Sequence, residues 1–539
     1  MQGKLLKTNR KNLIWGIISG LLLAIIFVWG WQLEFKGAVS FGKAATWLIT
    51  LLAWLGFAAL FTFLYSLEIN RPAKTFAGKL SPLKFYFLTA IALYVVWAIW
   101  ALGVYPGFFC YDSTWQWFMY DAGEITEHHP VLHTLMIGWF LRLGLDLTGT
   151  FTKGAFLYTL TQIGIIDLCV SYFMTYLYKK HVNRGIMIFS FAWFSLAPTV
   201  ICNVMAATKD SLFAGFVFAF FVLTLEMLED KEKFFLKWYR MAAWAVLFVL
   251  TAIMRNNALY PMLLLAIVLI FVNRKHLKRY LPTLLVTLLL LVLYKGPFTS
   301  AVTVSGVDEE EYYSVPVQQV MWVYFNENEN LTEEEKETIE GVFPEGAFTN
   351  YNPSIADGPK KYFDLEKYNS DKAYYNKLYL ELFRKYPADF FNAFLKNTDG
   401  LWYPWATLTV TMDGYVAHCI CRSYDPIYDD SIIPPLFNFL SLFENADFVV
   451  ENNATQWIFA PGTFFILFLF AFLLSLVKHR KEGLLLGFLL VYWLTFLLGP
   501  VALVRYVSYL YLMVPMFILI IVNAYRSDKK TPENLPDLK

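Results

Sequence analysis

Long apolar runs, separated by short basic or aromatic stretches, dominate the pattern of this chain. A helix that spans a bilayer needs about 20 mostly apolar residues, with a range of about 17–25. The candidate runs lie at about 12–33, 45–66, 86–104, 154–178, 185–202, 211–228, 240–254, 257–273, 281–296, 457–477, 484–501 and 506–525. Because two of them are short for a span, we predict an all-α polytopic membrane protein with about twelve transmembrane helices, within a range of about 11–13.

Basic residues mark every second connection between these runs, beginning with the segment before the first run. Loops rich in Lys and Arg stay on the cytoplasmic side of a membrane. The residues that follow this alternation are Lys4, Lys7, Arg10 and Lys11, then Arg71, Lys74, Lys79 and Lys84, then Lys179, Lys180 and Arg184, then Lys231, Lys233, Lys237 and Arg240, then Arg274, Lys275, Lys278 and Arg279, then Lys478, Arg480 and Lys481, then Arg526, Lys529 and Lys530. We therefore predict a multi-pass protein of the cell (plasma) membrane with cytoplasmic N- and C-termini.

The same alternation places the long polar connections outside the cell. The first, 105–153, interrupts a bundle of nine helices over 1–296. The second, 297–456, is acidic and aromatic with helical stretches, and we predict an α-rich soluble domain there. The last three membrane helices then occupy 457–525, and 526–539 forms a cytoplasmic tail.

Composition agrees with a bilayer as the solvent of this protein. Hydrophobic residues make up 58% of the chain and charged residues only 16%, against about 25% charged in soluble domains. The net charge of +1 gives no reason to expect a nucleic-acid partner. Cys419 and Cys421 form a C-x-C pair in the outer segment, for which a disulfide to a distant partner or two inert thiols is favoured over a metal site. Their oxidation state stays open.

Asp112 is the first candidate for chemistry. It follows a membrane helix directly and lies among aromatic residues. A carboxylate near an apolar interface is partly desolvated, so it can act as a general base or hold a metal ion. The structural alternative is a helix N-cap, because the sequence after Asp112 looks helical.

Three histidines lie within six residues: His128, His129 and His133. Pro130 suits the first turn of a helix, which would place His129 and His133 on a similar face. Two imidazoles at this spacing can bind a divalent cation such as Zn²⁺, or a phosphate when protonated. The metal candidates are therefore Asp112, His129 and His133. The structural alternative is that these rings hydrogen-bond to backbone carbonyls.

Three cations lie at outer turns, against the positive-inside bias. They are Lys209, next to Asp210, then Arg255, next to Asn256, and Arg505 before the last helix. Ionisable residues at membrane helix ends are costly to desolvate, and the arginine fork matches phosphate. Snorkelling to the interface explains any one of them, but explains three on one face less well.

In the outer domain, Gln319 and Trp402 stand in the segments Val-Pro-Val-Gln-Gln and Trp-Tyr-Pro-Trp. The tryptophan has two interpretations, a platform for stacking sugars or part of the interfacial aromatic belt, and the belt is the commoner one. The chain has no glycine loop for nucleotide phosphates and no nucleophile elbow, so we expect no ATP-driven mechanism.

Together these motifs resemble a family of uncharacterised bacterial polytopic membrane proteins that is itself similar to the GT-C glycosyltransferases. The resemblance runs from about 85 to 525 and rests on Tyr105–Asp112 with the downstream His-His-Pro, Thr-Lys209-Asp210, Arg255-Asn-Asn, Val-Pro-Val-Gln-Gln319 and Val-Ala-Leu-Val-Arg505-Tyr506. It implies an extracytoplasmic active site and a polyprenyl-phosphate or polyprenyl-pyrophosphate sugar donor. Asp112 would match the acidic residue that GT-C enzymes use as a catalytic or metal-binding carboxylate, and Lys209, Arg255 and Arg505 would hold the lipid phosphate. Asp112 lacks the adjacent second acid of many GT-C members, which puts a metal requirement in doubt.

The sequence thus favours a membrane glycosyltransferase that acts on a glycan, lipid or protein acceptor. Two other classes stay open. A transporter or flippase of a lipid-linked or anionic substrate would also place cations near the membrane, although an obvious inverted repeat is lacking. A non-catalytic cell-envelope assembly protein would instead depend on its outer domain.

Overall fold

The computed structural model describes residues 9–68, 76, 78–109, 112–306, 309–407, 427, 430–444 and 453–526. Cys419 and Cys421, the basic residues Lys4, Lys7, Arg71 and Lys74, and the tail beyond Arg526 lie outside these ranges. Every regular element in the described ranges is a helix, and pairing between extended segments is limited to isolated bridges. The all-α prediction is therefore confirmed.

Seven helices are long and apolar enough to cross a membrane. They are Arg10–Lys36 (α1, Arg10–Ala24, and α2, Gly30–Lys36, joined by a π-turn), α3 (Ala44–Ser66), α4 (Pro82–Gly103), α6 (Val131–Thr148), α7 (Phe151–Lys179), α10 (Lys209–Glu229) and Arg274–Val302, which contains α14 (Leu277–Leu293) and α15 (Thr299–Val302).

Two bent pairs raise this number to nine if each pair is one span. The first joins α8 (Arg184–Leu196) to α9 (Pro198–Met205) at 51°, and the second joins Val504–Leu512, containing α29 (Ser508–Leu512), to α30 (Val514–Tyr525) at 48°. Four shorter apolar helices complete the set: α12 (Trp238–Met254), Asn256–Val272 with α13 (Leu259–Val272), α27 (Pro461–Val477), and Glu482–Leu498 with α28 (Glu482–Thr495). The described chain thus has seven to nine membrane-length apolar helices, and twelve spans stay a prediction.

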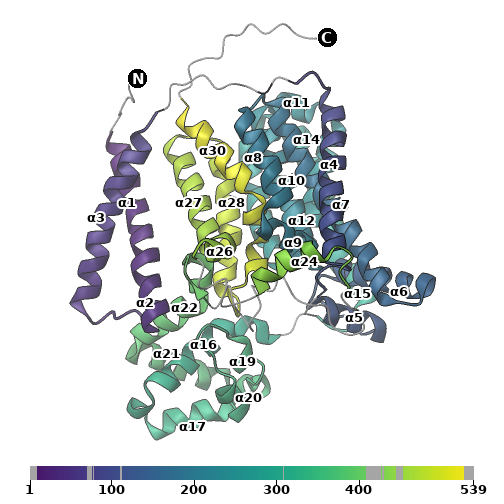
Figure 1. The fold of residues 1–539 in the computed structure, drawn as a ribbon. Helices are drawn as coiled ribbons and strands as arrows, with labels where there is room; N and C mark the ends of the chain where they lie inside the picture. Colours follow the sequence, from purple (N-terminus) through teal and green to yellow (C-terminus); the bar gives the residue numbers. More distant parts are fainter. Residues whose placement is uncertain are drawn as a thin grey trace.

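The helix α6 is apolar enough to be a span, yet the sequence pattern placed it in the first outer loop. Figure 1 shows α6 at the lower end of the bundle, beside α5 (Asp112–Ala122) and running outward from the long helices. The charged pair Arg142 and Asp146 on α6 is more than half exposed.

The bundle has two distinct ends. In Figure 1, α1 begins and α30 ends at the upper end, while the helices from α16 to α22 gather at the lower end. At the upper end, three lysines each donate a hydrogen bond to a carbonyl in the last turn of another helix: Lys11 Nζ to Val477 O at 2.5 Å, Lys231 Nζ to Val272 O at 2.6 Å, and Lys481 Nζ to Leu228 O at 3.0 Å. These cations satisfy carbonyls that a helix leaves unpaired and complement its dipole. Which end faces the cytoplasm stays a prediction.

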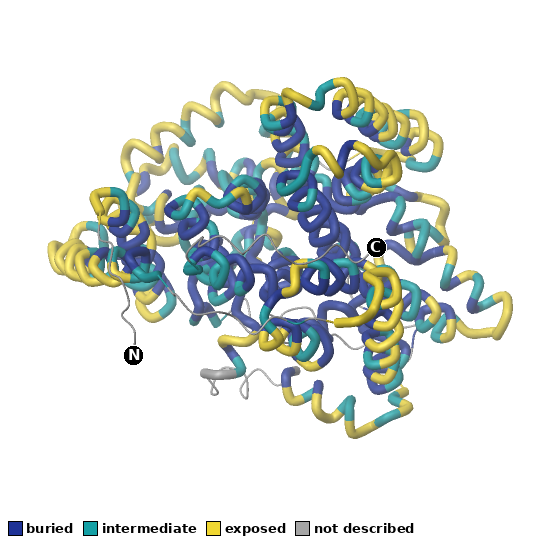
Figure 2. The backbone as a smooth tube through the Cα atoms, turned by 90° about the horizontal axis from the view of Figure 1, so that it is seen from above, coloured by how far each residue is buried: buried dark blue, intermediate teal, exposed yellow. Residues whose placement is uncertain are grey.

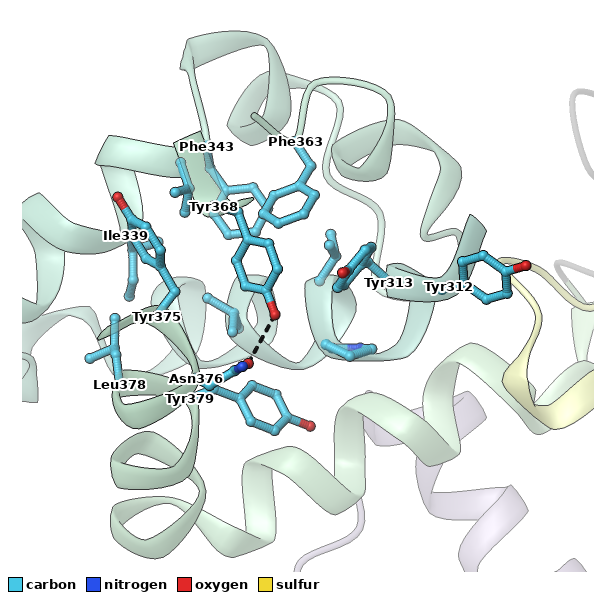
Figure 3. Close-up of a pocket in the computed structure, with 14 residues that line it drawn as sticks. Tyr312, Tyr313, Ile339, Phe343, Phe363, Tyr368, Tyr375, Asn376, Leu378 and Tyr379 are labelled. Carbon is cyan, nitrogen blue, oxygen red and sulfur yellow. Dashed lines mark hydrogen bonds between the residues drawn. The ribbon is translucent and has the colours of Figure 1, made fainter. Parts of the chain in front are cut away.

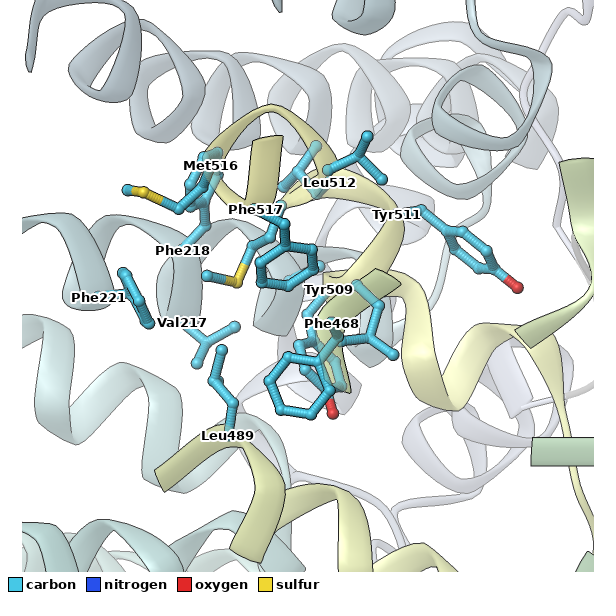
Figure 4. Close-up of a cluster of buried hydrophobic side chains, with 14 of the residues drawn as sticks. Val217, Phe218, Phe221, Phe468, Leu489, Tyr509, Tyr511, Leu512, Met516 and Phe517 are labelled. Atoms are coloured by element: carbon cyan, nitrogen blue, oxygen red, sulfur yellow. The ribbon is translucent and has the colours of Figure 1, made fainter. Parts of the chain in front are cut away.

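The helix α10 forms the centre of the bundle. It is apolar on all sides, a pattern typical of a helix that is buried all round. In its most apolar stretch of 18 residues, 94% of the residues are buried. Figure 4 shows its side chains meeting those of α27, α28 and α30, among them Val217, Phe221, Phe468, Leu489 and Phe517. Figure 2 shows a buried centre and an exposed rim. Large apolar side chains lie on that rim, such as Leu52, Leu55 and Ile91, as expected for surfaces that face lipid.

The inserted segment forms a helical domain with a core of its own. Its elements are η5 (Glu309–Tyr313), α16 (Ser314–Asn326), α17 (Glu333–Val342), α18 (Glu345–Thr349), α19 (Asp357–Lys360), α20 (Leu365–Ser370), α21 (Lys372–Lys385) and α22 (Pro387–Trp402). Its core residues include Met321, Ile339 and Phe390. We call Glu309–Trp402 the helical domain.

This domain is narrower than the predicted range 297–456. After the helical domain, α24 (Pro434–Ser441) returns to the bundle and packs against α4. Just before it, Ser431 Oγ donates to Gly103 O at 2.6 Å and Ile432 N to Leu102 O at 3.0 Å. The described part of 430–444 therefore belongs with the end of α4 rather than with the helical domain.

Candidate functional site

Three of the predicted residues meet at one oxygen atom. Lys209 Nζ lies 2.7 Å from Asp112 Oδ2, and Arg505 Nη1 lies 2.5 Å from the same oxygen. Asp112 is the first residue of α5, Lys209 is the first of α10, and Arg505 lies in the 3₁₀ turn Val504–Val507. The three side chains are 12–14% exposed, so the ion pairs are largely but not completely shielded from water.

Backbone contacts fix the two segments that carry Asp112 and Lys209. Phe108 N donates to Met205 O at 3.1 Å, and Ala207 N donates to Phe108 O at 2.8 Å. Ser113 Oγ, one residue after Asp112, donates to Ala207 O. The start of α5 is thereby held against the turn that precedes α10.

A second ion pair lies directly beside the first. Arg255 Nη1 is 2.6 Å from Asp210 Oδ1, and Arg505 Nη1 is 3.6 Å from Asp210 Oδ2, so Arg505 lies between the two aspartates. The ring of Tyr506 packs under both guanidinium groups, at 4.8 Å from Arg255 and 5.3 Å from Arg505. Cation–π contacts of this kind orient arginines. With all five ionised, the cluster of Asp112, Lys209, Asp210, Arg255 and Arg505 carries a formal charge of +1; we call it the charged cluster.

The electrostatic surroundings make Asp112 a weak base in this arrangement. Burial by itself would raise the pKa of the Asp112 carboxyl, but the positive charges of Arg505 and Lys209 lower it well below its usual value. A carboxylate whose charge is so strongly stabilised has little tendency to take up a proton. Asp112 Oδ2 is instead the anionic oxygen that pairs with both Lys209 and Arg505.

His129 is buried beside the same lysine. Its Nδ1 lies 3.0 Å from Lys209 Nζ, so a neutral ring accepts a hydrogen bond from the ammonium group. Burial and the charge of Lys209 lower the pKa of His129 to about 2. His128 is exposed and packs the edge of its ring against His129, with ring centroids 4.7 Å apart.

Acidification should destabilise the protein through His129. Its imidazole has an unfolded pKa of about 6.5 and a folded pKa of about 2, so between these values the unfolded state binds the extra proton. The stabilising contribution is complete above about pH 6.5 and falls as pH decreases, by about 2 kcal/mol at pH 5. Unfolding measured at pH 5 and pH 7 checks this, and the difference should shrink in His129→Gln. An equal difference in wild type and variant would contradict the assignment.

His133 has a structural role. Its Nδ1 lies 2.9 Å from Gln116 Oε1 and its Nε2 lies 2.7 Å from the Tyr158 hydroxyl, which donates to Gln162 Oε1 at 2.8 Å. The Gln162 amide in turn donates to the backbone carbonyls of Val204 and Ala206. This buried chain joins α5, α6 and α7 to the turn before α10.

The predicted metal candidates do not form a ligand set. His133 uses both ring nitrogens in its hydrogen bonds, and Asp112 and His129 both face the ammonium group of Lys209. Within the described ranges, no group of three or more His, Cys, Asp or Glu side chains is arranged to hold a metal ion. We therefore derive no step through a metal.

The remaining predicted residues lie in other surroundings. Asn256 accepts a hydrogen bond from Lys295 at 2.6 Å. Gln319 accepts from Tyr379 at 2.5 Å and donates to Phe390 O at 3.2 Å, inside the helical domain. Trp402 is buried, and its indole donates to Thr398 at 3.2 Å. In the part of the chain that the structure describes, none of these three is a hydrogen-bond partner of the charged cluster.

Two further residues, Tyr506 and Asp167, were not among the predicted site residues. Tyr506 belongs to the motif Val-Ala-Leu-Val-Arg505-Tyr506 but was not predicted as a site residue, because by sequence it could equally belong to the interfacial aromatic belt. Asp167 lies near the middle of α7, is 2% exposed, and accepts a hydrogen bond from Ser171 at 3.2 Å. A lone acid inside a long apolar run was the available signal for it.

One comparison with known proteins gives a match. A family model described as a family of unknown function (DUF6020) matches residues 116–534, which is most of the chain. The match includes Lys209, Asp210, Arg255 and Arg505 and begins just after Asp112. No curated protein and no solved structure matches the chain.

Proposed function

This chain belongs to the DUF6020 family, and because that family has no known function, we propose an activity from the site itself. We infer that the protein is a GT-C-type membrane glycosyltransferase. It transfers a sugar from a polyprenyl-phosphate-type donor to a cell-wall polymer, lipid or protein acceptor on the outer face of the membrane. The observation that carries this proposal is the convergence of Lys209 and Arg505 on one oxygen of Asp112.

An oxygen atom between two cations marks an anion-binding position. Phosphate oxygens form the same short, charge-assisted hydrogen bonds with Lys and Arg that Asp112 Oδ2 forms here. The charged cluster keeps a formal charge of +1 with Asp112 present, so a phosphate that displaces the carboxylate finds three cations within one cluster. A partly shielded site makes such contacts stronger than they would be in water.

The location of the cluster suits a donor with a lipid tail. Lys209 begins α10 and Arg255 directly follows α12, so both cations lie at the ends of apolar helices. The helical domain contacts the segment that leads to Arg505, since Ala356 N donates to Pro500 O at 2.7 Å. A lipid phosphate at the membrane surface lies at this level, while its chain stays among the apolar helices.

In the proposed reaction, an acceptor hydroxyl oxygen attacks the anomeric carbon of the donor sugar. The bond from that carbon to the phosphate oxygen breaks, and the phosphate leaves with the electron pair. Lys209 and Arg505 stabilise the charge that develops on the leaving oxygen. The proton of the acceptor hydroxyl passes to the Asp112 carboxylate. Attack opposite the leaving group inverts the anomeric centre.

Donor binding would also prepare Asp112 for this role. While Asp112 is paired with both cations, their charges hold its pKa well below the usual value. When the donor phosphate forms ion pairs with Lys209 and Arg505 in place of Asp112, the carboxylate loses part of that stabilisation. Its pKa then rises and it becomes a better base. The order of events limits proton abstraction to the donor-bound enzyme.

The direct test is turnover by the full chain in nanodiscs with a panel of polyprenyl-phosphate and polyprenyl-pyrophosphate sugars. We expect sugar transfer or release with at least one donor. Arg505→Gln should lower kcat/KM by about 10²–10³-fold, a size typical of removing a group that stabilises developing charge. Arg142→Gln, at an exposed position of α6, is the matched control and should leave turnover unchanged.

A lipid flippase is the second candidate, and Asp167 is the observation that favours it. Ionisable residues buried inside a membrane helix commonly serve ion or substrate passage. Absence of turnover together with transbilayer movement of the lipid in reconstituted vesicles would replace the transferase with the flippase. Absence of both activities would leave the envelope-assembly hypothesis.

A further inference from the structure

We propose that the helical domain binds an organic cation with an alkylated ammonium group in an aromatic pocket. The pocket has a volume of about 240 Å³. Half of its lining is aromatic, namely Tyr312, Tyr313, Phe343, Phe363, Tyr368, Tyr375 and Tyr379. Residues of the charged cluster do not line it, so this proposal is independent of the proposed transferase.

Several of the aromatic side chains that line the pocket also pack against Tyr368. Figure 3 shows Tyr368 in the middle, with Tyr313 and Tyr375 on its two sides. Ring centroids are 5.1 Å apart for Tyr313 and Tyr368, 5.4 Å for Phe363 and Tyr368, and 6.0 Å for Tyr368 and Tyr375. The Tyr368 hydroxyl is hydrogen-bonded to Asn376 Oδ1 at 2.9 Å, which orients the central ring. Faces of such rings are negative and attract cations, alkylated ammonium groups above all.

The charge of the domain agrees with a cationic ligand. Residues 309–402 contain 18 acidic and 9 basic side chains, a net charge of −9. An acidic surface raises the local concentration of cations and speeds their association. Asp364 caps the N-terminus of α20, which carries Tyr368, and Asp371 caps the N-terminus of α21, which carries Tyr375. Each of these two helices therefore begins with a carboxylate.

A sugar fits the same pocket less well. Sugars need several polar groups at fixed positions, whereas most of the non-aromatic lining is aliphatic, namely Pro316, Val317, Val320, Ile339, Val342 and Leu378. The Tyr379 hydroxyl donates to Gln319 and is therefore already engaged. An alkylated ammonium group needs the ring faces and little hydrogen bonding, which is what this lining offers.

Titration calorimetry on the full chain in nanodiscs tests this with choline and its neutral isostere 3,3-dimethylbutan-1-ol. We expect choline to bind at least about tenfold more tightly than the isostere, because only choline carries the charge. Tyr368→Leu should abolish binding, and Tyr368→Phe should retain it because the ring face remains. Tyr374→Leu, one residue from Tyr375 but outside the pocket lining, is the matched control.

The proposal fails if choline and the isostere bind equally or if neither binds. It also fails if methyl glycosides bind in place of choline and Tyr368→Phe loses that binding, since hydroxyl hydrogen bonds would then hold a sugar. None of these results depends on glycosyl transfer, so the failure of one proposal is distinguishable from the failure of the other.

Discussion

Asp112→Asn should reduce sugar transfer by about 10²–10⁴-fold, the range for loss of a general base, while the lipid-phosphate donor binds at least as tightly as in the wild type. The amide is nearly isosteric with the carboxylate but cannot accept the proton of the acceptor hydroxyl. It is also uncharged, so it no longer competes with phosphate for Lys209 and Arg505, which the wild-type carboxylate contacts at 2.7 and 2.5 Å. Turnover and donor affinity are therefore expected to change in opposite directions.

Single-turnover kinetics and a separate donor-binding measurement check the two parts of this result. Asp121→Asn is the matched control, because Asp121 lies on the same helix, α5, and is exposed. It should behave as the wild type in both measurements. If Asp112→Asn kept full turnover, the catalytic role of Asp112 would be disproved. If it lost turnover and donor binding together, Asp112 would be a donor ligand and not a competitor of the phosphate.

Asp210→Leu should destabilise the fold by about 3–5 kcal/mol, the cost of leaving a buried charge without its partner. Asp210 is 1% exposed, and its carboxylate lies 2.6 Å from Arg255 and 3.6 Å from Arg505. Without it, Arg255 remains buried against the rings of Phe496 and Tyr506, which offset its charge less well than a carboxylate does. The unfolding free energy in detergent, measured by denaturant titration, gives this value.

The double variant Asp210→Leu/Arg255→Met distinguishes two causes of instability: an unpaired buried charge on Arg255, and the loss of the ion pair itself. Replacing both charges of a buried pair by apolar side chains is often nearly neutral, so we expect the double variant to recover most of the stability. Asp146→Leu is the control for an exposed pair, since its partner Arg142 is more than half exposed, and it should change stability by less than about 1 kcal/mol. A double variant as unstable as the single one would show that the pair stabilises the bundle in another way.

Local patterns in the sequence were sufficient to predict the all-α fold and most of its long helices, although α6 was not among the predicted apolar runs. Helices cover most of each of the twelve apolar runs, because a bilayer-length apolar run has no better way to satisfy its backbone than a helix. The helical stretches of the helical domain were likewise visible in the sequence, and Thr332 with Glu335 forms the capping box that begins α17. The sequence did not separate 430–444 from the helical domain, because whether this segment packs on α4 or on α16 is not a local property.

For the site, the sequence by itself determined which residues carry charge at the ends of the apolar runs, because ionisable groups there stand out against those runs. Only the tertiary structure decided how they pair. Asp112 and Arg505 are 393 positions apart, and helix packing brings them to one oxygen atom. It also placed His133 in a buried hydrogen-bond chain, although its residue type had suggested a ligand for a metal ion or a phosphate. Residue type fixes what a side chain can do, whereas the packing of helices fixes its partners, and partners decide charge, basicity and access.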